Sequence, residues 1–168
     1  MSKTGSNLFN FDSGILQKDA FIIIVRTEWN APIVDKLEEG CLFILNKYQM
    51  TNVKIINVPG AFEIPFAIKS FWDSCTETFK RPQAFIALGC VLRGDTPHFE
   101  FISKAVTDGI NHLNISIPVP SVFGVLTVND QQQAEERVGG TQGHKGEEAA
   151  ITALKMIALK QSFYTNNS

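Results

Sequence analysis

Short apolar runs alternate along the chain with longer stretches in which apolar residues recur every three or four positions. The runs at 20–25, 53–58, 84–88 and 119–128 predict strands. The stretches between them predict helices that begin near Asn30, Glu63 and Thr96, and two more at 130–138 and 146–161. Because continuously apolar strands are buried on both faces, this alternation indicates an α/β fold with helices on both sides of a four-stranded parallel sheet.

The composition limits the classes of partner. With 168 residues, of which 44% are apolar and thirteen are Phe, the chain favours one domain with a sizeable core. A net charge of −2 without a basic block argues against nucleic acid, and no apolar run is long enough to cross a membrane. Three widely spaced cysteines without a CxxC pair fit a reducing compartment, so we expect a cytoplasmic protein.

We expect a single domain at 20–162, with an N-terminal tail at 1–19 and a C-terminal tail at 163–168. The N-terminal tail is polar apart from an isolated apolar patch at 8–11. This patch fits either a loose tail or a strand that pairs with a neighbouring subunit. Internal repeats and low-complexity linkers are absent from the sequence.

Ligands bind beyond the carboxyl ends of the strands in sheets of this kind, so the segments after the predicted strands are candidate sites. Trp29 and Asn30 follow the first strand and suit a planar heterocycle, through stacking and hydrogen bonding. The alternative is a Trp packed on the next helix and an Asn that only caps it. After the second strand, Gly60 lets the backbone turn sharply, and Glu63 either accepts hydroxyl hydrogen bonds or only complements the helix dipole.

The segment after the third strand is a candidate phosphate seat. Backbone N–H groups near Asp95 and Thr96 precede a predicted helix, and helix N-termini bind phosphate readily. His98 follows, and histidine is the side chain that most often transfers protons in catalysis; the alternative is a structural histidine at the edge of an apolar helix face. His112 and His144 lack metal-ligand spacing with it, so we expect no metal.

Two cations follow the fourth strand. Arg137 and Lys145 could neutralise a phosphate, or they could be surface charges among acidic neighbours. A different reading makes Cys90 the nucleophile of a cysteine hydrolase with His98 as its base, although the sequence offers no evident third group to orient the pair.

Taken in order, these segments resemble the lumazine synthase family. The strings are VPGAFEIPFA at 58–67, LGCVLRGDTPHFEFI at 88–102, PVPSVFGVLTVND at 118–130, AEERVGG at 134–140 and GHKGEEAA at 143–150. The resemblance implies a flavodoxin-like, three-layer α/β/α subunit. It also implies condensation of 5-amino-6-(D-ribitylamino)uracil with 3,4-dihydroxy-2-butanone 4-phosphate, the penultimate step of riboflavin biosynthesis, without a cofactor.

The resemblance assigns roles residue by residue. Trp29 stacks on the pyrimidine, and Asn30 binds the ring beside it. The ribityl chain is held by Phe62, Glu63 and Ile64, and the ring is lined by Val91 and Leu92. Phosphate-binding amides come from Asp95 and Thr96, and His98 transfers protons. Phe123, Arg137 and Lys145 complete the site of an adjacent subunit, with Arg137 on the phosphate and Glu148 paired to Lys145.

Shared sites imply a homo-oligomer. The family implies pentamers, and the short segment at 139–143 is compatible with their assembly into a sixty-subunit icosahedral shell, with riboflavin synthase as a candidate partner. The alternative function is a non-catalytic flavin- or lumazine-binding protein on the same scaffold. Such a protein would keep Trp29, Phe62 and Phe123 but would need neither His98 nor Arg137.

Overall fold

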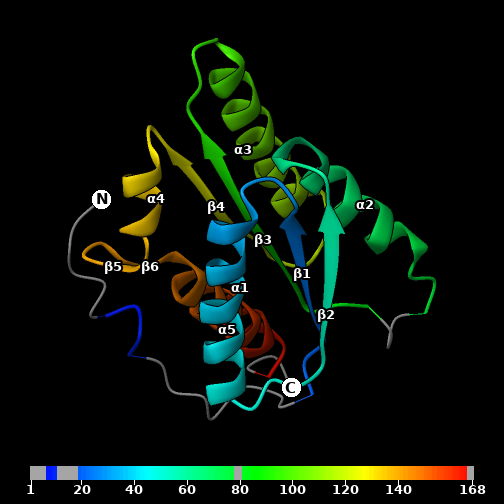
Figure 1. Cartoon of the computed structure of the whole chain (residues 1–168). Coiled ribbons are helices and arrows are strands. Elements are labelled where there is room, and N and C mark those ends of the chain that lie inside the picture. Colours follow the sequence, from blue (N-terminus) through cyan, green and yellow to red (C-terminus); the bar gives the residue numbers. More distant parts are fainter. Residues whose placement is uncertain (1–6, 11–18, 78–80, 166–168) are drawn as a thin grey trace.

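The computed structural model of the chain describes residues 7–10, 19–77 and 81–165 (Figure 1). Most of the N-terminal tail lies outside the described residues. Residues 8–10 of the apolar patch are described and lie at a turn, and the pairing of this patch with a neighbouring subunit stays a prediction. Within the tail, the Asn7 carbonyl accepts a hydrogen bond of 3.1 Å from Lys155 Nζ, and Leu8 packs against the core.

A four-stranded sheet forms the centre of the domain. Its strands are β1 (Ile22–Thr27), β2 (Val53–Val58), β3 (Ala84–Leu92) and β4 (Ser121–Val128), in the order β2-β1-β3-β4. Every neighbouring pair is parallel, with Ile22 opposite both Val53 and Ala84. This confirms the predicted α/β class and the four-stranded parallel sheet, in the strand order of flavodoxin-like folds.

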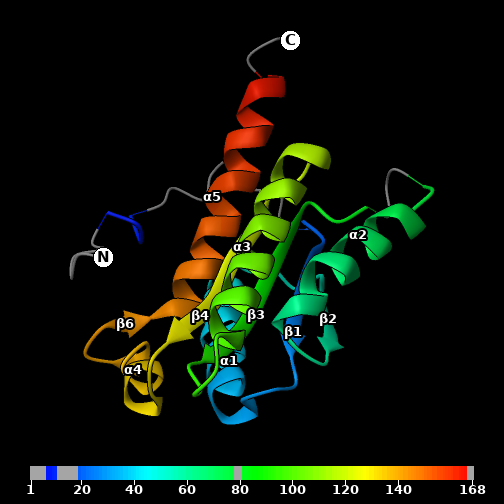
Figure 2. The same ribbon diagram turned by 90° about the horizontal axis from the view of Figure 1, so that it is seen from above.

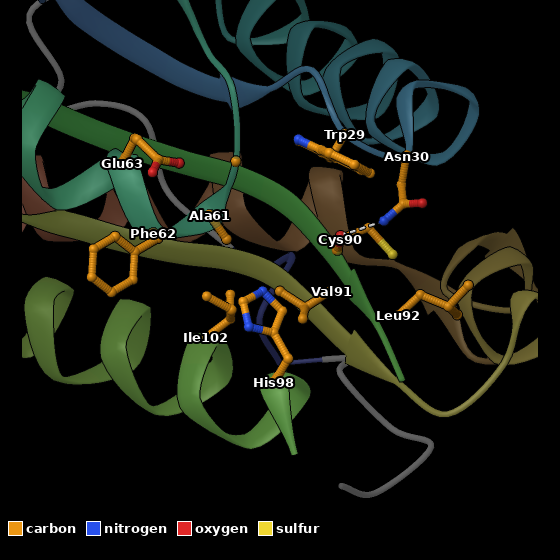
Figure 3. A pocket seen from close by; sticks show the side chains of 11 residues that line it. Trp29, Asn30, Ala61, Phe62, Glu63, Cys90, Val91, Leu92, His98 and Ile102 are labelled. Atoms are coloured by element: carbon orange, nitrogen blue, oxygen red, sulfur yellow. Dashed lines mark hydrogen bonds between the residues drawn. The ribbon is translucent and has the colours of Figure 1, made fainter. Parts of the chain in front are cut away.

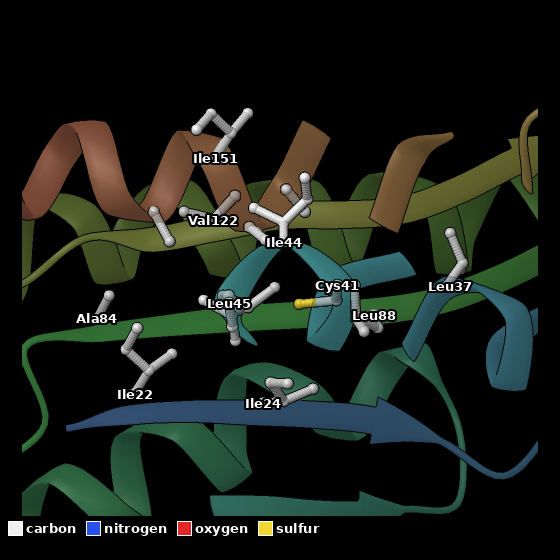
Figure 4. Packing of buried hydrophobic residues seen from close by; sticks show 14 of the residues in the cluster. Ile22, Ile24, Leu37, Cys41, Ile44, Leu45, Ala84, Leu88, Val122 and Ile151 are labelled. Atoms are coloured by element: carbon white, nitrogen blue, oxygen red, sulfur yellow. The ribbon is translucent and has the colours of Figure 1, made fainter. Parts of the chain in front are cut away.

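Helices cover both faces of the sheet (Figures 1 and 2). Alternate strand residues point to opposite faces, so Ile22 and Ile24 join a cluster with α1 (Ala31–Lys47) and α5 (Lys145–Thr165). Figure 4 shows how Leu37, Cys41 and Leu45 of α1 pack onto these strands. Ile23 and Val25 join the opposite cluster, with α2 (Ile64–Ser74) and α3 (His98–Ser116). A 3-10 turn, Ala61–Glu63, leads into α2.

Several predicted boundaries differ from the structure. β3 continues to Leu92 instead of ending at residue 88, because Gly89, Cys90, Val91 and Leu92 keep pairing with β4. The helix predicted at 130–138 is only the short α4 (Gln131–Glu135), so that prediction was wrong beyond residue 135. The helix predicted to begin at the Thr96–Pro97 cap signal starts at His98, and no side chain caps it. α5 runs to Thr165, past residue 162, where we expected the domain to end.

An antiparallel hairpin takes the place of the end of the helix that was predicted at 130–138. It consists of β5 (Val138–Gly140) and β6 (Gly143–His144). Gly139 and Gly143 have φ angles of 108° and 85°, a region that only glycine enters without strain, so the glycines that end the helix also build the hairpin. None of the helices among the described residues is long and apolar enough to cross a membrane.

Candidate active site

A pocket of about 660 Å³ opens at the carboxyl ends of β1 and β3 (Figure 3). The chain leaves β1 toward β2 on one side and later returns to β3 on the other, which makes this place the topological switch point of the sheet. Ligands of open α/β sheets bind at such a point. The lining residues come from the loops after β1 and β2, the end of β3 and the start of α3: Trp29, Asn30, Gly60, Ala61, Phe62, Glu63, Cys90, Val91, Leu92, His98 and Ile102.

The segment after β1 supplies an exposed aromatic face. The Trp29 side chain is 71% exposed, and its backbone N–H donates to the Pro59 carbonyl at 3.2 Å, which ties this loop to the one after β2. The reading in which Trp29 packs on the neighbouring helix is therefore wrong. Figure 3 shows Trp29 on one side of the pocket and His98 with Ile102 on the other, so a flat ring has room between them.

Asn30 links the loop after β1 to the end of β3 in the wall of the pocket. It stands at the N-cap position of α1 with φ 59° and ψ 39°, a left-handed conformation, and its side chain makes no capping hydrogen bond. Instead, Nδ2 donates to the Cys90 carbonyl at 2.8 Å. The reading of Asn30 as only a helix cap is also wrong, because the amide is used to hold two strand ends together at the pocket.

The segment after β2 places an aromatic ring and a carboxylate at the rim. Phe62 is 59% exposed, and Glu63 is half-buried at the N-cap position of α2. A Cβ on Gly60 would lie 3.1 Å from Glu63 Oε2, which is a tight contact, and 3.6 Å from Trp29 Cδ1, which is an ordinary one, so a side chain there would press on the carboxylate. The Ile64 side chain is fully buried in the core beneath α2 and does not line the pocket.

The end of β3 forms the floor of the pocket. Val91 is half-buried and Leu92 is 36% exposed, and both line it. Burial raises the pKa of the Cys90 thiol to about 11, and only 5% of the residue is exposed. A nucleophilic cysteine needs a lowered pKa and access to solvent, so these properties argue against a cysteine hydrolase.

His98 is the first residue of α3 and is exposed at the pocket. Asp95 and Thr96 are exposed in the loop before it and do not line the pocket. Arg93 holds this loop: its Nε donates to Asn129 Oδ1 at 2.9 Å, it pairs with Glu100, and its guanidinium lies 4.1 Å from the Phe99 ring centroid. The positive charge nearest in sequence to the predicted phosphate seat is thus already engaged.

Phe123, Arg137 and Lys145 do not line the pocket of their own chain. Phe123 is 38% exposed on β4, and Arg137 Nη1 donates to the Gln133 carbonyl at 3.2 Å. Lys145 forms the predicted ion pair with Glu148. Figure 2 places α4 and the β5–β6 hairpin on the far side of the domain from α2.

Sequence reasoning did not single out Ala61 or Ile102 as lining residues, and it noted Cys90 only as a rival nucleophile. Ile102 was detectable, since it follows His98 by four residues and so lies on the same face of α3. Cys90 was detectable too, since it lies in the segment after the expected strand end, where ligands of such sheets bind. The described pocket combines apolar walls, one carboxylate and one imidazole, a set that can stack on a ring, accept hydroxyl hydrogen bonds and move protons.

Comparison with known proteins places these features in a family. The family model described as 6,7-dimethyl-8-ribityllumazine synthase matches residues 19–161. Proteins of that name are similar to this chain in Parabacteroides distasonis (42% identity; 89% of this chain and 91% of the relative) and in Cytophaga hutchinsonii (43%; 94% and 98%). The protein of the same name in Bdellovibrio bacteriovorus is 40% identical over 82% of this chain and 74% of its own length.

Proposed function

This chain belongs to the 6,7-dimethyl-8-ribityllumazine synthase family, and we propose that the pocket between β1 and β3 is its active site. The protein is a transferase of riboflavin biosynthesis that condenses 5-amino-6-(D-ribitylamino)uracil with 3,4-dihydroxy-2-butanone 4-phosphate, releasing phosphate and water. The observation that carries the site proposal is that seven of the residues assigned by resemblance line one pocket: Trp29, Asn30, Phe62, Glu63, Val91, Leu92 and His98.

The uracil substrate fits the part of the pocket between the loops after β1 and β2. We assign the stacking face to Trp29, whose exposed ring is free to cover a pyrimidine. Glu63 accepts hydrogen bonds from ribityl hydroxyls, with Phe62 beside the chain and Ile64 contributing only backbone groups, since its side chain is buried. Val91 and Leu92 form the apolar floor under the ring.

The phosphate substrate fits the start of α3. The amides of Asp95 and Thr96 precede this helix, whose N-terminus carries a partial positive charge. His98 stands between that seat and the stacking region, where it can exchange protons with the reacting groups. Arg137 supplies the phosphate with a full positive charge from a neighbouring subunit, a charge-assisted contact.

The chemistry requires only proton transfers and the departure of phosphate. The uracil amine attacks the ketone, and loss of water gives an imine. Loss of the proton at C3 expels phosphate by elimination and leaves an enol, which tautomerises to a second carbonyl. The ring closes by attack of the ribitylamino nitrogen on that carbonyl, with loss of a second water. His98 moves protons in these steps, and the two binding regions hold the reacting atoms close together, which by itself accelerates such condensations strongly.

We propose that each site is shared between subunits of a pentamer. Support comes from Phe123, Arg137 and Lys145, which match family site positions yet lie outside the pocket of their own chain. Phe123 is partly exposed on β4, the strand at the edge of the sheet, where a neighbour can reach it. Assembly into an icosahedral shell, association with riboflavin synthase and a cytoplasmic location remain predictions from the sequence.

Complementation between inactive variants tests the proposal. Trp29→Ala and Arg137→Ala should each lose most lumazine formation, which is followed by the fluorescence of the product. If the sites are shared, oligomers co-assembled from both variants should regain part of the activity, because some interfaces then contain an intact Trp29 and an intact Arg137. Absence of recovery in proven mixed oligomers would refute the shared site, and absence of product from the unmodified protein would favour the non-catalytic alternative.

A further inference from the structure

We propose that His144 is a positioning residue whose ring, seated on Gly40 of α1, holds the β5–β6 hairpin and thereby places Arg137 and Lys145 for the neighbouring site. The proposal rests on the function proposed above for those two cations. It concerns a residue that no step of the chemistry uses and that lies outside the pocket.

The imidazole occupies the space that a side chain at position 40 would need. A Cβ built on Gly40 would lie 2.1 Å from His144 Cε1, 2.5 Å from Nδ1 and 2.6 Å from Nε2. Such distances are far below van der Waals contact, so ring and glycine are matched to each other. Gly139 of the hairpin approaches from the other side, where an added Cβ would lie 3.6 Å from Cδ2.

Packing, and not hydrogen bonding, holds this ring. His144 Nδ1 is buried and has no hydrogen-bond partner among the described residues. An unpaired buried nitrogen costs free energy and is retained only where the contacts of the ring compensate for it. The ring therefore acts by its shape, as the part of the hairpin that is inserted against α1.

The hairpin connects this contact directly to both cations. His144 is the strand partner of Val138, the residue after Arg137. The backbone N–H of Lys145 donates to the Arg137 carbonyl at 2.8 Å, and the Lys145 side chain pairs with Glu148 at the start of α5. A displacement of His144 would therefore move the backbones of Arg137 and Lys145 together.

A second contact anchors the same region to α1 and offers a control. A Cβ on Gly146 would lie 2.0 Å from the Leu37 carbonyl oxygen, so the start of α5 also packs on the backbone of α1. This crowding is with backbone atoms and would remain if the His144 ring were removed. Gly40→Ala and Gly146→Ala are thus matched variants. Removal of the ring by His144→Ala can relieve the crowding in the first variant but not in the second.

The first experiment is a melting-temperature cycle, which does not depend on the proposed function. Gly40→Ala should lower the melting temperature strongly or prevent folding, and His144→Ala in the same chain should restore much of the loss. Gly146→Ala should be equally harmful with or without His144→Ala. If Gly40→Ala is harmless, or if His144→Ala rescues neither glycine variant, the seat does not exist and the proposal is overturned.

The second experiment measures positioning through steady-state kinetics of the intact oligomer. His144→Ala should raise the KM for 3,4-dihydroxy-2-butanone 4-phosphate by about tenfold, since displacements near 1 Å at a site cost that much or more. The KM for the uracil substrate should change much less. Because His144 is proposed to act in part through Arg137, His144→Ala should have a smaller effect in a chain that already carries Arg137→Ala than in the wild-type chain.

Two outcomes of the kinetic experiment would overturn the positioning role. One is a loss of affinity for both substrates by the same factor, and the other is a full additional effect in the Arg137→Ala chain. Failure of the proposed function has a different signature: Arg137→Ala alone would leave the KM for the phosphate substrate unchanged, while the melting-temperature cycle would still report the seat.

Discussion

Two replacements of Asn30 separate the hydrogen bond of its side chain from the left-handed conformation of its backbone. Its amide links the β1 loop to the end of β3 through the 2.8 Å hydrogen bond to the Cys90 carbonyl. Its backbone is left-handed, with φ 59°, a conformation that Asn tolerates better than other residues with a Cβ. Asn30→Ala removes the donor and strains the backbone, whereas Asn30→Gly removes only the donor.

The structure sets the size of each effect. Loss of one intramolecular hydrogen bond costs about 0.5–1.5 kcal/mol of net stability. A left-handed Ala costs roughly 1–2 kcal/mol more. The free energy of unfolding should therefore fall by about 1.5–3.5 kcal/mol in Asn30→Ala, and the Gly variant should be more stable than the Ala variant by about 1–2 kcal/mol. Both should bind the uracil substrate more weakly, because the loop that carries Trp29 is no longer tied to β3.

Urea denaturation of the three proteins and titration with a lumazine analogue give the necessary numbers. Gln49 is the control, since it is exposed at the other end of α1 and is also left-handed, with φ 62°. Gln49→Gly should raise the free energy of unfolding, because glycine is favoured at this position after a helix, and should leave analogue binding unchanged. Equal stability of the Ala and Gly variants at position 30 would refute the strain argument. Wild-type stability in Asn30→Gly would show that the hydrogen bond contributes nothing.

The remaining predictions concern three titratable groups: His98, Cys90 and Glu100. His98→Ala should lower turnover by about tenfold to a hundredfold while leaving the oligomer and product-analogue binding intact; unchanged turnover from about pH 6 to pH 8 would exclude proton transfer by His98. Because the pKa of Cys90 is raised from 9.0 to about 11, iodoacetamide should modify it slowly at neutral pH and leave activity largely intact, as mass spectrometry and the fluorescence assay can check. Because the raised pKa of Cys90 disfavours the thiolate in the folded state, the free energy of unfolding in urea should fall as the pH rises from about 9 toward 11. This fall should be smaller in Cys90→Ser. The hydrogen bond from Arg93 lowers the pKa of Glu100. The pair therefore stabilises the fold above the ordinary carboxyl pKa, and this stabilisation is lost as the pH falls through the lowered pKa. In an NMR titration, Arg93→Gln should raise the pKa of Glu100.

The sequence was most informative where residues are buried. β1 was predicted within two residues of its observed bounds, because a continuous branched apolar run has few alternatives to a strand covered on both faces. β2 was predicted at its observed bounds, although Val58 is its one buried residue. The α/β class and the parallel sheet followed from the alternation of such runs with amphipathic stretches. The helix predicted at 130–138 failed where Gly139 and Gly143 build a hairpin, because glycine ends a helix in several ways that a single sequence does not distinguish.

The pocket was predictable in location but not in detail. The rule that ligands bind beyond the strand ends pointed to the loops holding Trp29, Glu63 and His98, which do line one cavity. The use of the Asn30 amide was not predictable, since a donor before a helix normally caps it, and only the folded chain brings Cys90 within 2.8 Å. The seat of His144 was equally invisible, because it depends on a glycine more than a hundred residues earlier in the chain.

The charges around the pocket give an independent reason for a shared site. Among the side chains that line it, Glu63 is the only permanently charged one, and it is negative. A phosphate ester close to a carboxylate is repelled by roughly 1 kcal/mol per pair of unit charges in water and several times more near a protein surface. The nearby guanidinium of Arg93 is engaged by Glu100 and Asn129, so the phosphate needs a cation that the described pocket does not supply. The guanidinium of Arg137 has the Gln133 carbonyl as its one hydrogen-bond partner among the described residues and does not line the pocket of its own chain, so we expect it to provide that charge to a neighbouring subunit's pocket. A monomer that bound the phosphate substrate as tightly as the oligomer would contradict this argument directly.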